Sequence, residues 1–150
     1  MSDPTSALPG LSGPVAITLG YLGAYYASIV NVLRVKRTLQ REYEARGETF
    51  DRYATADKRM LAADRVQLNT LEHMPPFLTL LWLDATLVSA LHASVLGGAY
   101  LASRLVYPLM VGKTLGAGAP AHIGRVTFVG YAALGLLAID LAWALVRAWL

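Results

Sequence analysis

Long apolar runs separate the polar parts of this chain. The first run covers residues 15–33, 19 residues without a charge, and the last covers residues 126–146, 21 residues with a single acid, Asp140. A helix of the first length is about 28 Å long, close to the hydrocarbon thickness of a lipid bilayer. Each run therefore predicts a membrane-spanning helix.

The middle of the chain predicts two more helices. Residues 74–112 contain only two formally charged side chains, Asp84 and Arg104. One helix over this stretch would be about 58 Å long, too long for a single crossing, so we expect a tight turn at Gly97 and Gly98. The whole pattern predicts an all-α membrane protein, a four-transmembrane-helix up-down bundle, with helices at roughly residues 14–40, 58–95, 98–113 and 125–148.

The basic residues predict the orientation of this bundle. Residues 34–65 hold nine of the 13 basic side chains, and Lys113 and Arg125 in the last loop lie on the same side, opposite Arg147. Loops rich in Lys and Arg stay in the cytoplasm. We therefore expect the 34–65 segment to be cytoplasmic and both termini to lie outside.

Composition agrees with a single membrane domain over residues 1–150. Charged residues make up 15% of the chain, against about 25% in soluble domains, and hydrophobic residues make up 55%. The basic residues gather in one interhelical segment, which excludes a nucleic-acid reader. The chain has no cysteine and no metal-ligand spacing, so we expect no disulfide framework and no metal site. Abundant Ala and Leu, without a retention signal, favour a bacterial inner membrane over an endoplasmic reticulum.

Three polar side chains share one face of the second predicted helix. Arg65, Asn69 and Glu72 are spaced i, i+4 and i+7, which places them in a row about 10 Å long. Such a row suits a zwitterionic ligand, because the carboxylate can take an ammonium and the guanidinium can take a carboxylate. A salt bridge within the helix, with a capping amide, explains the same spacing.

A second polar row lies on the third predicted helix. Tyr100, Arg104 and Tyr107 have the same spacing, and Arg104 lies within an apolar run. An arginine inside a bilayer costs roughly 2.5–3.5 kcal/mol on insertion scales, so Arg104 needs a partner. We expect Glu72, since both residues lie toward the cytoplasmic ends of adjacent antiparallel helices. The pair either serves a site or ties two helices together.

The residues around these two rows resemble a known family. The segment RVQLNTLEHMPPF at residues 65–77 and the segment GAYLASRLVY at residues 98–107 are similar to the second-helix hallmark and the third-helix segment of the MAPEG superfamily. Its members are membrane-associated proteins in eicosanoid and glutathione metabolism, including microsomal glutathione transferases. Close similarity covers residues 65–112.

The resemblance implies a homotrimer that binds glutathione as a cosubstrate between subunits, while a lipophilic acceptor enters from the lipid bilayer. It implies that glutathione is held by six side chains, Arg34, Arg65, Gln67, Asn69, Glu72 and Tyr107. It also implies that Arg104, Tyr107 and Arg125 position or activate the thiol, which attacks as the thiolate.

Two positions depart from the family pattern. Transferases of the family carry a second tyrosine where this chain has Val111, and a loop arginine where this chain has none between Lys113 and Arg125. We expect a glutathione-dependent transferase or peroxidase acting on lipophilic electrophiles or lipid hydroperoxides. A non-catalytic protein that binds lipid or a partner is the alternative. A small transporter using Asp84 and Asp140 has little support, since no inverted repeat is visible.

Overall fold

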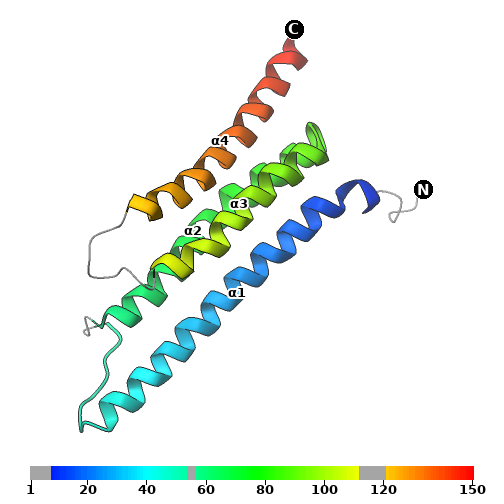
Figure 1. The fold of residues 1–150 in the computed structure, drawn as a ribbon. Helices are drawn as coiled ribbons and strands as arrows, with labels where there is room; N and C mark the ends of the chain where they lie inside the picture. Colours follow the sequence, from blue (N-terminus) through cyan, green and yellow to red (C-terminus); the bar gives the residue numbers. More distant parts are fainter. Residues whose placement is uncertain (1–7, 54–56, 112–120) are drawn as a thin grey trace.

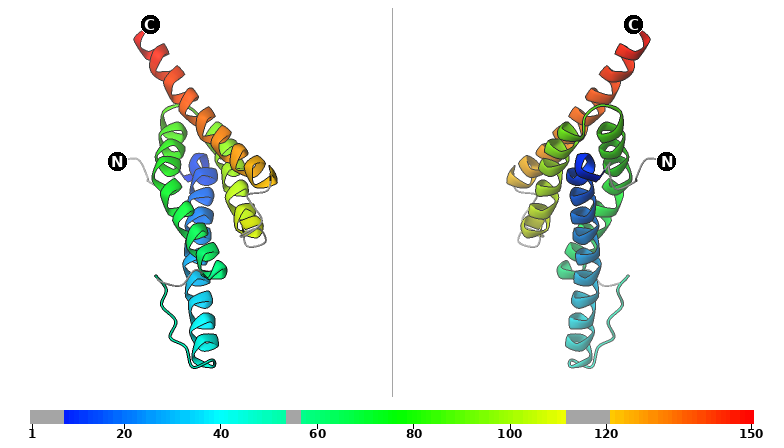
Figure 2. Two further views of the ribbon diagram at one scale, coloured as in Figure 1. Left: turned by 90° about the vertical axis from the view of Figure 1, so that its left-hand side faces the viewer. Right: turned by 90° about the vertical axis from the view of Figure 1, so that its right-hand side faces the viewer.

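Four α-helices make up the part of the chain that the computed structural model describes, residues 8–53, 57–111 and 121–150 (Figure 1). They are α1 (Leu8–Glu44), α2 (Lys58–Leu87), α3 (Ala90–Val111) and α4 (Ala121–Trp149). Successive helices run in opposite directions, so the start of α1 and the end of α4 lie at the same end of the molecule (Figures 1 and 2). This arrangement confirms the predicted all-helical four-helix bundle.

Three of these helices are long and apolar enough to cross a membrane, over Gly10–Glu44, Ala90–Val111 and Gly124–Trp149. The chain is therefore an integral, multi-pass membrane protein. α2 is less apolar because charged residues such as Arg65 and Glu72 lie in its first half, and its apolar part, residues 74–87, is about 21 Å long. That α2 also crosses the bilayer stays a prediction.

The turn between α2 and α3 lies at Val88 and Ser89, which corrects the prediction of a turn at the glycine pair. The carbonyl oxygen of Asp84 accepts hydrogen bonds from the amide groups of both turn residues, at 2.9 and 2.8 Å. These bonds satisfy a carbonyl oxygen in the last turn of α2, which has no partner within the helix. The hydroxyl of Ser89 then accepts a hydrogen bond from the His92 amide at 3.3 Å, near the start of α3. Capping hydrogen bonds, rather than glycine flexibility, end the helix here.

Gly97, the first glycine of the pair, serves helix packing instead. A Cβ atom at Gly97 would lie 2.6 Å from Leu81 Cδ1 and 3.3 Å from Ile17 Cδ1, and both of these side chains are buried. A Cβ atom at Gly98 would meet nothing within 4 Å. Small residues let membrane helices approach closely. Gly97 therefore sets the spacing of α3 from α1 and α2.

Three fully buried aromatic rings form the centre of the bundle. Phe77 of α2 packs against Tyr21 of α1 and Tyr100 of α3, with ring centroids 5.1 and 4.1 Å apart. The Tyr21 hydroxyl donates a hydrogen bond to the carbonyl oxygen of Thr70 at 2.6 Å. Aromatic pairs at such separations contribute about 0.5–1.5 kcal/mol beyond their burial. This cluster fixes α3 against α1 and α2 about one turn of α3 before Arg104.

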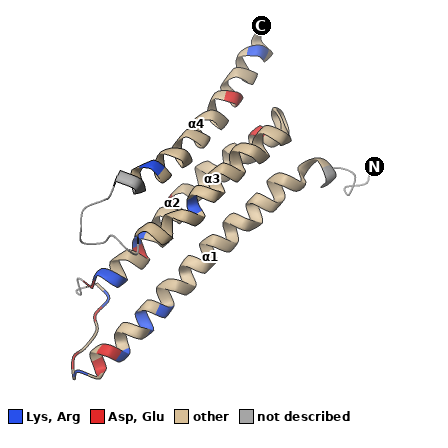
Figure 3. Ribbon diagram, viewed as in Figure 1, with Lys and Arg blue, Asp and Glu red and all other residues tan. Residues whose placement is uncertain are grey.

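The polar segment folds as an arm that extends beyond the other helices and carries much of the charge (Figures 2 and 3). The arm comprises residues 34–53 and 57–65 and continues α1 past its predicted end at residue 40. Its small core contains Leu39 of α1 with Met60 and Ala63 of α2, all buried. This packing stabilises the last turns of α1, which is why the helix continues to Glu44.

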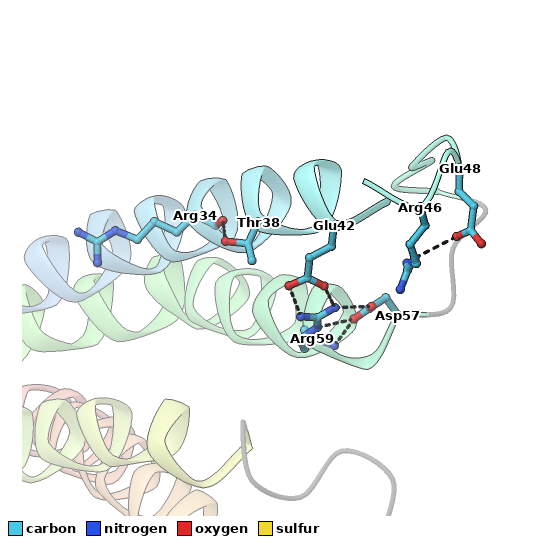
Figure 4. Close-up of polar contacts among 7 residues, drawn as sticks. All are labelled: Arg34, Thr38, Glu42, Arg46, Glu48, Asp57 and Arg59. Atoms are coloured by element: carbon cyan, nitrogen blue, oxygen red, sulfur yellow. Dashed lines mark hydrogen bonds and ion pairs between the residues drawn. The ribbon is translucent and has the colours of Figure 1, made fainter. Parts of the chain in front are cut away.

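Ion pairs close the arm at the start of α2 (Figure 4). The Arg59 guanidinium donates to both carboxylate oxygens of Glu42, at 2.9 and 2.6 Å. Asp57 caps α2, because its Oδ1 accepts a hydrogen bond from the Arg59 amide at 2.8 Å. The hydrogen bond from the Arg59 side chain lowers the pKa of Asp57. The stabilisation by this charged cap is thus present at neutral pH and is lost only as the pH falls through that lowered pKa.

We predict that Gly97→Ala destabilises the bundle whereas Gly98→Ala does not. Both substitutions gain about 1 kcal/mol of helix propensity. Only the first forces Leu81 and Ile17 aside, and overpacking of a core costs about 1–3 kcal/mol. Thermal unfolding of the detergent-purified variants should show a lower melting temperature for Gly97→Ala than for Gly98→Ala. Equal melting temperatures would contradict the proposed role of Gly97.

Candidate functional site

Arg104 is the centre of the candidate site. Its side chain lies within the bundle, with 4% of the residue surface exposed. Nη1 donates a hydrogen bond to Oδ1 of Asn69 at 2.7 Å, and the guanidinium lies 5.0 Å from the centroid of the Tyr100 ring. A hydrogen bond to a charged group contributes about 1.5–3 kcal/mol. The two polar rows, one on α2 and one on α3, therefore meet at this hydrogen bond.

Asn69, and not Glu72, is the partner of Arg104. The sequence predicts Glu72, but the structure leaves its carboxylate exposed, and no ion pair joins it to Arg104 in the described part of the chain. The buried face of α2 includes Phe77 and Leu81. Glu72 lies on the opposite side of that helix, while Asn69 lies on its flank next to α3. The rotation of α2 about its axis therefore decides which side chain reaches the guanidinium.

The guanidinium of Arg104 keeps two nitrogens without a hydrogen-bond partner among the described residues. These atoms, Nε and Nη2, are buried. α4 approaches Nη2 at Gly130, where a Cβ atom would lie 2.9 Å from this nitrogen and 2.9 Å from the Ser103 hydroxyl. A buried charged donor without an acceptor is costly. An anionic group of a ligand would satisfy it.

A cavity of about 240 Å³ adjoins Arg104 between α1, α2 and α3. Its walls are mostly apolar, formed by Ala24, Ala27, Val66, Leu105 and Pro108. Polar side chains reach it from Ser28, Asn31, Thr70 and Arg104. A largely apolar cavity with a few converging polar groups is the usual form of a small-molecule site. This cavity suits an amphipathic ligand with a negative charge.

The other residues that the family resemblance implicates lie outside this cavity. Arg65 is exposed on the outer face of α2 near Glu72, and Gln67 is half-buried. Tyr107 is half-buried on α3, about one turn after Arg104. None of these side chains lines the cavity beside Arg104.

The two remaining predicted residues lie on α1 and α4. Arg34 is exposed and lines a smaller hollow of about 140 Å³ together with Thr38 and Arg59. Arg125 is exposed near the start of α4. The contacts of the described residues do not connect either arginine to Arg104.

Sequence reasoning misses one contact between α2 and α4. Nε2 of His73 lies 3.4 Å from the hydroxyl of Tyr131, and their ring centroids are 5.3 Å apart. The two residues are 58 positions apart. No spacing pattern could have paired them, because only the packing of α4 onto α2 brings them together.

The two lone acids belong to a different part of the bundle. Asp84 is fully buried near the end of α2, and neither of its carboxylate oxygens has a hydrogen-bond partner among the described residues. Oδ2 of Asp140 lies 3.5 Å from Nδ1 of His92, near the start of α3. Neither acid contacts Arg104, so the candidate site does not include them.

A membrane-embedded four-helix bundle with a buried arginine beside an apolar cavity is the class of protein that this structure defines. The model of the MAPEG family matches residues 14–143. The chain therefore belongs to the MAPEG family, which confirms the resemblance seen in its sequence. A comparison with curated proteins found no match.

We predict that Asn69→Ala destabilises the bundle more than Glu72→Ala. Loss of the amide leaves Nη1 of Arg104 without its acceptor, which costs about 1.5–3 kcal/mol. Loss of an exposed carboxylate away from such contacts changes stability by about 0.5 kcal/mol or less. Thermal unfolding in detergent measures both effects. A larger effect from Glu72→Ala would show that Glu72 is the partner after all.

Proposed function

We propose that this protein is a membrane-embedded, glutathione-dependent transferase or peroxidase acting on lipophilic electrophiles or lipid hydroperoxides. Its family supports the proposal, since many MAPEG members are glutathione-dependent enzymes. The observation that carries it is Arg104, a buried cation with two unpartnered nitrogens beside a largely apolar cavity. Such a group suits a thiolate that must meet an apolar substrate.

Arg104 stabilises the glutathione thiolate in this proposal. Only the thiolate attacks, and an opposite charge within about 4–6 Å lowers the pKa of an acidic group by about 1–3 units. Shielding from water strengthens this effect. The sulfur then forms a bond to an electrophilic carbon, whose leaving group departs with the electron pair of the broken bond. With a hydroperoxide, the sulfur takes the terminal oxygen as the O–O bond breaks, which releases the alcohol, and a second glutathione converts the resulting sulfenic acid to the disulfide and water. Asn69 holds the guanidinium in position.

The charged side chains on the outer face of α2 complement the rest of glutathione, which carries two carboxylates and one ammonium. Arg65 and Arg34 take the carboxylates, and Glu72 takes the ammonium. Gln67 and Tyr107 add neutral hydrogen bonds. Since Arg65, Arg34 and Glu72 are exposed in the single chain, their side chains are free to bind a ligand at the protein surface.

A homotrimer is part of the proposal and explains why these charges lie on an outer face. Charged side chains that face hydrocarbon are costly, so membrane proteins turn them toward protein or water. A neighbouring subunit against α2 would cover Arg65 and Glu72 and enclose glutathione between the two chains. Arg125 at the start of α4 then belongs to the same interface as a further candidate for activating the thiol.

A non-catalytic protein that binds lipid or a partner is the second candidate function. Val111 favours it, because this buried side chain ends α3 where transferases of the family carry a second tyrosine. Glutathione or a lipid could then bind without turnover. Binding of glutathione with no reaction toward several model electrophiles would select this candidate.

We predict that the detergent-purified protein binds glutathione and that Glu72→Ala weakens this binding about tenfold or more. The substitution removes a charge-assisted hydrogen bond that contributes about 1.5–3 kcal/mol. Isothermal titration calorimetry measures the affinity. Glu48→Ala is the control, because this exposed glutamate pairs with Arg46 in the arm. An unmodified protein that does not bind glutathione would remove the proposal.

We also predict that Arg104→Gln lowers the fraction of bound glutathione present as thiolate by about tenfold near neutral pH, since the thiol loses its cationic neighbour. The ultraviolet absorbance of the thiolate measures this fraction. Arg104→Lys keeps the charge and should keep most of the band. If the band survives in Arg104→Gln but disappears in Arg125→Gln, then Arg125 activates the thiol instead.

A further inference from the structure

A row of arginines on α1 lies outside the candidate cavity. Arg34, Arg37 and Arg41 are spaced i, i+3 and i+7, so they follow one face of the helix, and all three are exposed. Val32 and Leu39 on the other side of α1 are buried in the core of the arm. The three arginines, here termed the basic row, therefore lie on the side of α1 opposite this core, and Arg34 also borders the hollow that it shares with Thr38 and Arg59.

Three other arginines of the arm differ from the basic row because each has an acid within ion-pair distance: Glu48 for Arg46, Asp64 for Arg52, and Glu42 with Asp57 for Arg59. Arg65, at the end of the arm, has no ion pair among the described residues and belongs to the proposed glutathione site. No described acid pairs with a guanidinium of the basic row. Figure 4 shows the Arg34 side chain extending away from Glu42, while the carbonyl oxygen of Arg34 accepts a hydrogen bond from Thr38. The basic row thus keeps its charge available for an external partner.

The position of the basic row along α1 indicates what that partner is. The uncharged run of residues 15–33 ends directly before Arg34. Arg41 lies about 10 Å further along the helix axis. The headgroup layer of a bilayer is about 5–8 Å thick on each side. The basic row therefore covers the height of the lipid phosphates, and Glu44, about one turn beyond Arg41, ends it with the opposite charge.

We propose that the basic row binds the anionic phospholipid headgroups of the leaflet next to the arm. A guanidinium binds phosphate oxygens bidentately, and juxtamembrane basic residues are attracted to anionic lipids. The lipid headgroup supplies the negative charge that no side chain of the arm provides. The proposal does not depend on glutathione chemistry, because Arg37 and Arg41 have no part in the candidate site.

Lipid selectivity of the full-length protein tests this proposal. The protein is reconstituted in phosphatidylcholine vesicles that contain a trace of spin-labelled phosphatidylglycerol or spin-labelled phosphatidylcholine, and the immobilised fraction of each label gives their relative affinity. We expect a preference for phosphatidylglycerol that falls about threefold or more in Arg37→Gln/Arg41→Gln. It should also fall in about 1 M salt, where charges are screened beyond roughly 3 Å. Arg37→Lys/Arg41→Lys should keep most of it.

A matched pair of single substitutions separates the effect of the basic row on lipid preference from the effect of the overall charge of the arm. Arg37→Gln and Arg46→Gln each remove one exposed arginine, but Arg46 is bonded to Glu48 beyond the end of α1. We expect Arg37→Gln to lower the preference and Arg46→Gln to leave it unchanged. An equal loss in both, or a preference that survives in Arg37→Gln/Arg41→Gln, would overturn the proposal. So would an unmodified protein without any preference.

The double variant also distinguishes the proposed glutathione-dependent function from the proposed binding of anionic lipids. Glutathione binding by Arg37→Gln/Arg41→Gln, measured by calorimetry, should equal that of the unmodified protein because Arg34 and the α2 residues are intact. Circular dichroism checks that the variant keeps its helices. A variant that loses glutathione binding but keeps its lipid preference would overturn the assignment of the basic row to lipid.

Discussion

A charged guanidinium inside an apolar helix bundle must be hydrogen-bonded, and Arg104 imposes this requirement on three helices. Asn69 of α2 supplies an acceptor, and the ring of Tyr100 offers its face to the cation. Gly130 lets α4 approach Nη2 of Arg104, because a Cβ atom at this position would lie 2.9 Å from that nitrogen. The polar centre of the bundle is therefore built around one side chain, and the aromatic cluster beside it keeps α3 in place.

The hydrogen bond between Arg104 and Asn69 does not satisfy every donor of the guanidinium. One amide oxygen serves one nitrogen of the guanidinium, and the other two nitrogens have no partner among the described residues. A group held rigidly with unused donors is preorganised for an anion, because it need not reorganise when the anion forms. Asn69 then acts as a positioning residue through its oxygen, and its amide hydrogens stay available to a ligand. This division of roles connects the packing of the bundle to the proposed thiolate chemistry.

The arm shows that a count of charges does not describe what the charges do. Nine basic residues occur in residues 34–65. In the sequence, their number alone predicts how the protein is oriented in the membrane. The structure distinguishes arginines that hold the arm together, such as Arg59 with Glu42, from those of the basic row, which are exposed and have no described acid as a partner. The first kind stabilises the fold of the arm, and the second kind is available to the membrane.

The amino-acid sequence alone predicts the helical class of the protein, three of its membrane spans, its family and the two polar rows. These features are local, because the length of an apolar run and the spacing of polar residues along a helix do not depend on neighbouring helices. The packing of the helices alone shows that Asn69 rather than Glu72 meets Arg104, that α2 ends at Leu87, and that Gly97 packs against Leu81. Each of these depends on how a helix is rotated about its axis and how closely it approaches its neighbours. A hydrophobic pattern shows which broad face of a helix is buried, but the atoms of the neighbouring helices select the side chain that makes each contact.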